Sequence, residues 1–131
     1  MGQPIRVLLV DDERDFLETI SFWLSAKGYQ VSIAIGGEQA LEHLKRERPD
    51  IVCLDVNMPG VDGIETLRRI RTVHKQLPVI LVTASYQDQN KFAGAQALGI
   101  SGLFPKGGSL SELSQALEVA LRTHAKPSPP S

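Results

Sequence analysis

The stretch Ile5-Arg6-Val7-Leu8-Leu9-Val10 decides the fold, and the acidic residues Asp11-Asp12-Glu13 follow it directly. A short, mostly apolar run with β-branched residues is typical of a strand that is buried on both faces of a sheet. Farther along the chain, apolar residues recur with the spacing of one face of an amphipathic helix: Phe16, Leu17, Ile20, Trp23 and Leu24. The pattern predicts a strand followed by a helix, with the acidic residues at the turn between them.

The same alternation continues to the end of the chain. Further strands are predicted over residues 31–35, 51–54, 79–82 and 102–104, and further helices around the apolar positions of 40–44, 64–70, 92–98 and 110–121. Gly28 and Gly99 stand where helices should end in a left-handed residue. Five strand–helix units imply a doubly wound α/β fold, in which a parallel sheet carries helices on both faces.

Length and composition restrict the class of protein. The 131 residues, with 42% hydrophobic and 22% charged side chains, fit one globular domain. The formal net charge of −1 gives no basic footprint for nucleic acid, and no apolar run reaches the ~20 residues of a membrane helix. The single cysteine, Cys53, excludes a disulfide framework and a cysteine-rich zinc site. We therefore expect a cytoplasmic protein that binds neither membrane nor nucleic acid.

Charged and polar residues stand where the predicted strands end. Asp11 and Asp12 follow the first strand, Asp55 ends the third, Thr83 ends the fourth, and Lys106 follows the fifth. In an open parallel sheet these ends meet at one edge, which is where ligands bind. Two carboxylates ~4 Å apart repel by about 4 kcal/mol at an effective dielectric constant near 20, so the cluster needs a cation. Oxygen ligands without histidine or cysteine favour Mg²⁺ over zinc.

Asp55 is also a candidate nucleophile, because carboxylates form aspartyl-phosphate intermediates. In that chemistry a metal ion holds the phosphoryl oxygens, and Lys106 and Thr83 would complete a cage of charge and hydrogen bonds around them. The sequence thus predicts a phosphoryl-transfer site at the carboxyl edge of the sheet.

Four separate motifs resemble the receiver domain of two-component response regulators. They are Asp11-Asp12, Leu54-Asp55-Val56-Asn57-Met58-Pro59-Gly60-Val61-Asp62-Gly63, Val82-Thr83-Ala84 and Lys106. The resemblance covers about residues 5–123. It implies a flavodoxin-like three-layer sandwich with the strand order 2-1-3-4-5.

The resemblance also implies a metal site. Asp12, Asp55 and the backbone carbonyl of Asn57 would bind Mg²⁺, or Mn²⁺ in its place, directly, and Asp11 would bind it through water.

The resemblance also assigns roles around the phosphoryl group to four residues. Asp55 would accept the group from a phosphohistidine or from acetyl phosphate, and Lys106 would pair with the phosphoryl group or with Asp55. The Thr83 hydroxyl would follow the group, and small Ala84 would leave room for it and offer its N–H. Such a domain is no enzyme in the ordinary sense, since it promotes only its own phosphorylation and dephosphorylation.

The partners implied are a bacterial sensor histidine kinase or phosphotransfer protein, and an output domain or target protein. They would be reached through the face formed by the fourth helix, the fifth strand and the fifth helix. Leu103 and Gly107 depart from the family pattern on this face, where an aromatic residue and a proline are usual. Residues 1–124 are expected to form the domain, and the Pro/Ser-rich residues 125–131 a tail or the start of a linker.

Other functional classes fit the residues less well. An FMN carrier of the same fold would have a hydroxyl- and glycine-rich loop after the first strand, where this chain has Asp11-Asp12-Glu13. A dehalogenase-type phosphatase would have a second acidic residue at position 57, but this chain has Asn57 there. A dinucleotide enzyme would have the motif G-x-G-x-x-G after the first strand, and this chain has no such motif there. The alternative that stays open is a degenerate receiver that binds partners without being phosphorylated.

Overall fold

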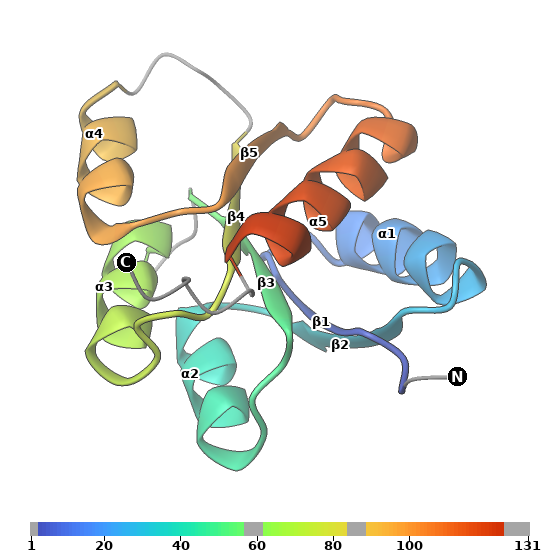
Figure 1. Cartoon of the computed structure of the whole chain (residues 1–131), viewed down its shortest axis with the longest axis horizontal. Helices are drawn as coiled ribbons and strands as arrows, with labels where there is room; N and C mark the ends of the chain where they lie inside the picture. Colours follow the sequence, from blue (N-terminus) through green and yellow to red (C-terminus); the bar gives the residue numbers. More distant parts are fainter. Residues whose placement is uncertain (1–2, 57–61, 84–88, 125–131) are drawn as a thin grey trace.

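The computed structural model describes residues 3–56, 62–83 and 89–124, and its strands form one parallel five-stranded sheet. The strands are β1 (Arg6–Val10), β2 (Gln30–Ala34), β3 (Ile51–Asp55), β4 (Val79–Thr83) and β5 (Gly102–Pro105). The helices are α1 (Arg14–Ala26), α2 (Gly37–Arg46), α3 (Gly63–Val73), α4 (Gln89–Leu98) and α5 (Leu110–His124). The order β2-β1-β3-β4-β5 confirms the predicted doubly wound α/β fold (Figure 1). No helix in the described ranges is long and apolar enough to span a bilayer.

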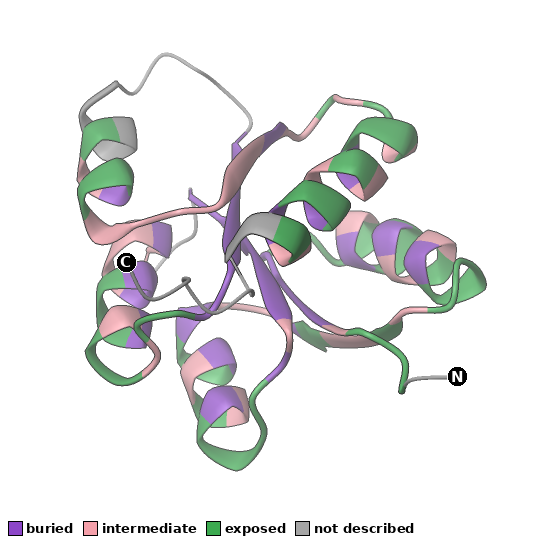
Figure 2. Ribbon diagram, viewed as in Figure 1, coloured by how far each residue is buried: buried purple, intermediate pink, exposed green. Residues whose placement is uncertain are grey.

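The sheet separates two apolar clusters, one under each layer of helices. Successive strand residues point to opposite faces. Thus Val7 and Leu9 of β1 pack in the cluster beneath α1 and α5, whereas Leu8 and Val10 pack beneath α2, α3 and α4. Figure 2 shows the buried positions of the helices turned toward the sheet. The near-continuous apolar runs of the strands are explained by this burial on both faces.

Local signals in the sequence end and begin the helices, and the left-handed residues predicted at Gly28 and Gly99 are confirmed. Gly28 and Gly99 have φ angles of +100° and +95°, the left-handed region that L side chains rarely adopt. Before α5, Ser109 and Glu112 form a reciprocal capping box: the Glu112 N–H donates to Ser109 Oγ at 3.1 Å, and the Ser109 N–H to Glu112 Oε1 at 3.3 Å. Strand β2 begins one residue earlier than predicted, because Gln30 pairs in register with the first residue of β1.

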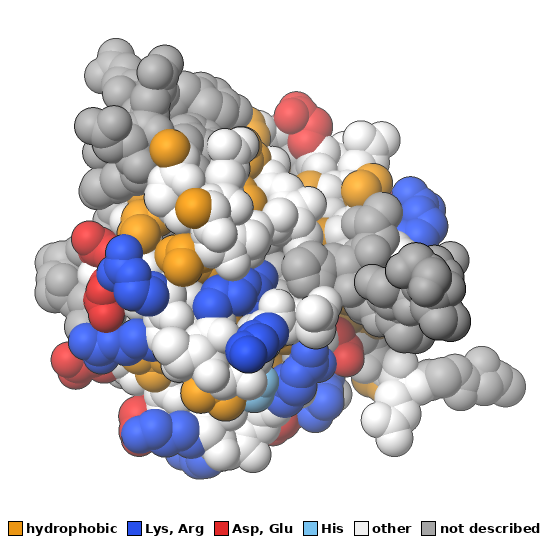
Figure 3. All heavy atoms as spheres, turned by 60° about the vertical axis from the view of Figure 1, so that its left-hand side comes forward, with side chains coloured by type: hydrophobic (Ala, Val, Ile, Leu, Met, Phe, Trp, Pro, Cys, Tyr) orange, Lys and Arg blue, Asp and Glu red, His pale blue; other side chains and the backbone are white. Residues whose placement is uncertain are grey.

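One hollow of the described surface lies away from the acidic strand ends. A hollow of about 380 Å³ opens between Leu41 and Lys45 of α2 and Arg69 and Val73 of α3, with His74 directly after α3. These residues belong to the C-terminal halves of helices that run antiparallel to the strands, so they lie at the opposite edge of the sheet. Figure 3 turns this side forward and shows Lys and Arg side chains around patches of hydrophobic atoms. This hollow therefore lies apart from the acidic cluster, and the chemistry of the side chains locates the functional site.

Candidate functional site

The carboxyl ends of β1 and β3 bring three aspartates together. Asp11 and Asp12 follow β1 and Asp55 ends β3, and one carboxylate oxygen of each lies within 4.8 Å of those of the other two. Asp11 and Asp55 are buried, whereas Asp12 is exposed. Three carboxylates at this spacing repel one another strongly in a partly buried setting. The predicted convergence is confirmed, and the cluster has the donor chemistry of a site for a hard divalent cation.

Lys106 supplies the positive charge of this cluster from the end of β5. Its Nζ lies 3.0 Å from Asp11 Oδ2 and 3.7 Å from Asp55 Oδ2, and it also pairs with the carboxylate of Glu13. Burial disfavours the ammonium, but the hydrogen bonds to Glu13 and Asp11 and the charges of Asp55 and Asp11 outweigh it, so the pKa of Lys106 is raised. Lys106 is therefore a fixed cation at neutral pH.

The Asp11 side chain is held in a turn that leaves one oxygen facing the cluster. Asp11 Oδ1 accepts the N–H of Glu13 at 2.8 Å and a hydrogen bond from Lys106 Nζ at 3.1 Å. Asp11 Oδ2 is buried and, although it lies 3.0 Å from the Lys106 Nζ, among the described residues it accepts no hydrogen bond of good geometry. A buried carboxylate oxygen with spare acceptor capacity suits a water molecule, including one bound to a metal ion.

Thr83 ends β4 in the buried part of the same edge, 3% exposed. Its carbonyl accepts the N–H of Lys106 at 2.8 Å, so the backbone connects the ends of β4 and β5 at the site. The structure thus gathers Thr83, Lys106 and the three aspartates at one edge of the sheet. Two further predicted site residues, Asn57 and Ala84, lie outside the described residues.

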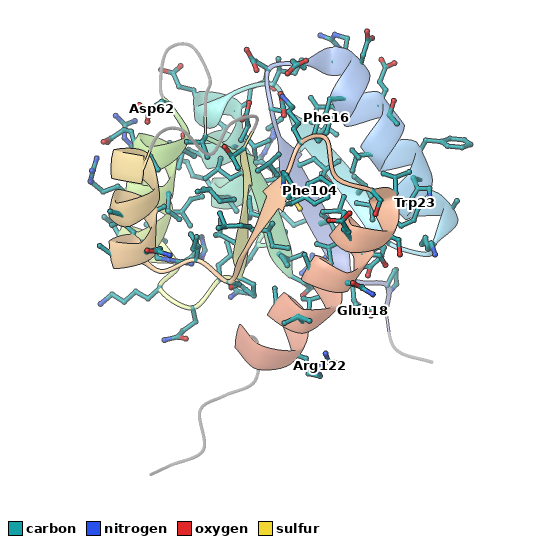
Figure 4. All side chains as sticks on the ribbon, turned by 90° about the horizontal axis from the view of Figure 1, so that it is seen from above. Phe16, Trp23, Asp62, Phe104, Glu118 and Arg122 are labelled. Carbon is teal, nitrogen blue, oxygen red and sulfur yellow. The ribbon has the colours of Figure 1, made fainter. Side chains whose placement is uncertain are left out.

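Gly63, the first residue of α3, fixes the backbone at Asp55. The Gly63 N–H donates to the Val56 carbonyl at 3.2 Å, and a Cβ at Gly63 would stand 2.1 Å from the Asp55 carbonyl oxygen. The preceding Asp62, labelled in Figure 4, caps α3 by accepting the Glu65 N–H at 2.8 Å. This hydrogen bond fixes the start of the helix at Gly63. The close approach explains why the Asp-Gly pair stands where α3 meets the end of β3.

Sequence reasoning missed two residues at the site, Glu13 and Phe16. The Glu13 carboxylate pairs with Lys106, and the ring centroid of Phe16 lies 4.9 Å from the Lys106 Nζ, within the range of a cation–π contact. Figure 4 shows Phe16 on α1, near the end of β1. Glu13 had a signal, since it is an acidic residue directly after the aspartate pair. Phe16 had none, because its place in the helix repeat indicates only burial.

Cys53, in the middle of β3, belongs to the core rather than to the site. It is 3% exposed, and burial raises the pKa of its thiol to about 12. A thiol that stays protonated at neutral pH is a poor nucleophile and metal ligand. Cys53 therefore behaves as a small buried hydrophobic residue.

Comparison with known proteins places these residues in a family. A family model described as the response regulator receiver domain matches residues 7–118. The response regulator MprA of Mycolicibacterium vanbaalenii is 39% identical over 119 residues, which are 91% of this chain and 51% of that protein. MprA of Mycobacterium leprae is 39% identical over 118 residues, 90% of this chain and 51% of that protein. The chain therefore spans about half the length of these curated relatives.

Solved structures give the same result. The chemotaxis protein CheY4 of Vibrio cholerae matches with a TM-score of 0.82 and 29% identity, over 88% of this chain and 97% of that one. NtrX of Brucella abortus matches with a TM-score of 0.85 and 27% identity, over 93% of this chain and 28% of that one. Because the family model covers most of the chain and these structures share its fold, the chain belongs to the response regulator receiver domain family of two-component systems.

Proposed function

We propose that Asp55 is the phosphoacceptor of this receiver domain. The observation that carries the proposal is the cluster of three carboxylates within 4.8 Å, two of them buried, with the Lys106 ammonium 3.7 Å from Asp55. An Asp55 carboxylate oxygen attacks the phosphorus of a phosphohistidine on a sensor histidine kinase or phosphotransfer protein. The new P–O bond replaces the P–N bond, and the imidazole nitrogen keeps the electron pair and takes a proton from solvent. With acetyl phosphate, acetate is the leaving group.

We propose further that the acidic cluster holds Mg²⁺, with Mn²⁺ as a substitute. Asp12, Asp55 and the Asn57 backbone carbonyl would bind it directly, and Asp11 through water. The donor set supports this assignment, because carboxylate oxygens are hard ligands and Asp11 Oδ2 is buried with spare acceptor capacity. When bound, the ion neutralises the charge that develops on the transferring phosphoryl group.

Lys106 and Thr83 would bind the phosphoryl group of phosphorylated Asp55 rather than assist the attack of Asp55 on phosphorus. The Lys106 ammonium would pair with the phosphoryl oxygens, and the Thr83 hydroxyl and the Ala84 N–H would donate to them. Since Lys106 follows β5 directly and its N–H bonds the Thr83 carbonyl, a change at the phosphoryl group can reach β5 through this backbone link. The face formed by α4, β5 and α5 is the proposed route to an output domain or target protein. Residues 1–124 are the proposed extent of the receiver domain, with residues 125–131 as a tail or the start of a linker.

Acetyl phosphate labelling with MgCl₂, followed by intact-mass measurement, tests the assignment. The wild-type chain should gain one phosphoryl group, and chelation of the metal should abolish the gain. Asp55→Ala should not be labelled, while Asp15→Ala, which removes an exposed carboxylate from the first turn of α1, should label normally. Equal labelling of the Asp55→Ala protein would sink the proposal. A folded wild-type chain that is never labelled would favour the degenerate receiver.

The order of the metal ligands has its own test. Asp12→Ala should weaken Mg²⁺ binding more than Asp11→Ala, because a direct charged ligand contributes more than a partner that acts through water. Loss of a water-mediated partner lowers metal affinity about 10- to 100-fold. Calorimetric titration of MgCl₂ into each variant measures the difference. Equal losses would contradict the assignment of direct and water-mediated ligands.

A further inference from the structure

Glu13 occupies the N-cap position of α1, but its side chain does not cap the helix. Its carbonyl accepts the Leu17 N–H at 3.1 Å, whereas its carboxylate makes no capping hydrogen bond. N-cap positions favour short side chains whose oxygen accepts a hydrogen bond from the helix backbone. The Glu13 carboxylate pairs instead with Lys106, 93 residues away in the sequence. The Glu13 side chain therefore forms an ion pair with Lys106 instead of capping α1.

The partners of the Lys106 ammonium lie at different depths. Glu13 is at the surface, with its side chain 63% exposed, whereas the side chains of Asp11 and Asp55 are 2% and 3% exposed. Asp11 Oδ1 accepts a hydrogen bond at 3.1 Å and the Phe16 ring lies 4.9 Å away, but Asp55 at 3.7 Å is beyond hydrogen-bond distance. The ammonium thus lies closer to Asp11 and Glu13 than to Asp55.

We propose that Glu13 is a positioning residue that holds the Lys106 ammonium beyond hydrogen-bond distance of Asp55 and competes with phosphorylated Asp55 for this ammonium. The proposal rests on the phosphoacceptor role of Asp55. A phosphoryl group carries more negative charge and more acceptor oxygens than a carboxylate, so it attracts the ammonium more strongly. To approach it, Lys106 has to give up part of its contact with Glu13. Because that ion pair is exposed on the Glu13 side, its contribution is modest and it can exchange.

Binding of beryllofluoride, a phosphoryl mimic, at saturating MgCl₂ tests the competition. Glu13→Gln keeps the shape of the side chain and removes its charge. It should bind the mimic roughly two- to fivefold more tightly, the size expected for loss of a partly exposed ion pair. Asp15→Asn is the matched control, since it removes a carboxylate from the first turn of the same helix, and it should leave the affinity unchanged. In a Lys106→Ala background the Glu13→Gln gain should vanish.

The ammonium signal of Lys106 in ¹⁵N spectra of the chain without metal or mimic tests the positioning directly. Glu13→Gln should shift this signal and speed its hydrogen exchange, and Asp15→Asn should do neither. A signal unchanged in Glu13→Gln overturns the hold on Lys106. A gain in affinity that persists without Lys106 overturns the competition. A wild-type chain that binds no beryllofluoride overturns the phosphoacceptor role and the competition with it, while the ammonium signal still decides whether Glu13 positions Lys106.

Discussion

Replacing Gly63 by alanine should destabilise the protein and distort its site at the same time. Gly63 begins α3 directly against the end of β3, and a Cβ there would lie 2.1 Å from the Asp55 carbonyl oxygen and 2.7 Å from the Val56 Cα. Both are backbone atoms, so no side-chain rotation can relieve the overlap. Either the end of β3 or the start of α3 has to move by about 1 Å, since ordinary contacts begin near 3.4 Å.

Overpacking of a tight site usually costs 1–3 kcal/mol, and an overlap with the backbone belongs at the upper end of that range. We therefore expect Gly63→Ala to lower the free energy of unfolding by about 2–3 kcal/mol. For a domain with a stability of about 5–15 kcal/mol this is a large fraction. The same movement displaces Asp55, so labelling by acetyl phosphate should slow as well, even where the variant is fully folded.

Urea unfolding followed by circular dichroism measures the loss, and Gly94→Ala is the control. Gly94 lies within α4, and the nearest atom to a Cβ there is Ile64 Cγ2 at 4.0 Å. Alanine has no overlap to resolve at this position and should stabilise α4 by about 0.5–1 kcal/mol through helix propensity. The two substitutions are chemically identical and should act with opposite signs. A Gly63→Ala chain with the wild-type unfolding midpoint would refute the close approach of α3 to Asp55.

Three further outcomes can be measured on the same chain. The thiol of Cys53 has a pKa of about 12 in the folded chain against an ordinary value of 9.0, so between these pH values only the unfolded chain loses the thiol proton, and stability falls as pH rises. The free energy of unfolding from urea titrations should therefore be about 1.4 kcal/mol lower at pH 10 than at pH 8 because of this group. The Cys53→Ala variant should lack this difference. Arg71→Ala should cost about 1.5–3 kcal/mol, because the guanidinium donates to the carbonyls of Leu98, Gly99 and His74, and thermal unfolding that matches wild type would contradict it. Arg68→Ala removes only an exposed ion pair on the same helix and should change stability by less than about 0.5 kcal/mol in the same assay.

The parts of the fold that depend on local chemistry were predictable. Burial on both faces of the sheet requires apolar runs such as that of β3, and a left-handed residue requires a glycine such as Gly28 or Gly99. The capping box of Ser109 and Glu112 needs only a three-residue spacing. The convergence of Asp11 and Asp55 followed as well, because parallel topology alone brings strand ends to one edge.

The contacts that periodicity could not give join segments far apart in the chain. The hydrophobic pattern of α3 says which side of the helix is buried, but not that Arg71 reaches the carbonyls at the end of α4, 27 and 28 residues away. It likewise gives no hint that the turn before α1 and the end of β5 place Glu13 beside Lys106. Such contacts depend on how the helices cross over the sheet. The residue pattern of a single helix or strand does not contain this information.

The contacts of Lys106 connect the stability of this site with its chemistry. Its ammonium pairs with Asp11, Glu13 and Asp55, and Asp12 joins Asp11 and Asp55 in the acidic cluster, so carboxylates outnumber ammonium groups among the described residues of the site. Two of these carboxylates are buried, where repulsion is screened least. A bound cation relieves that repulsion only in the folded chain, so it stabilises the fold by mass action. The same excess charge would favour a divalent ion at the end of β3, and its positive charge would offset the negative charge of a phosphoryl group on Asp55. The repulsion among these carboxylates therefore underlies both the expected stabilisation by a cation and the reactivity proposed for Asp55.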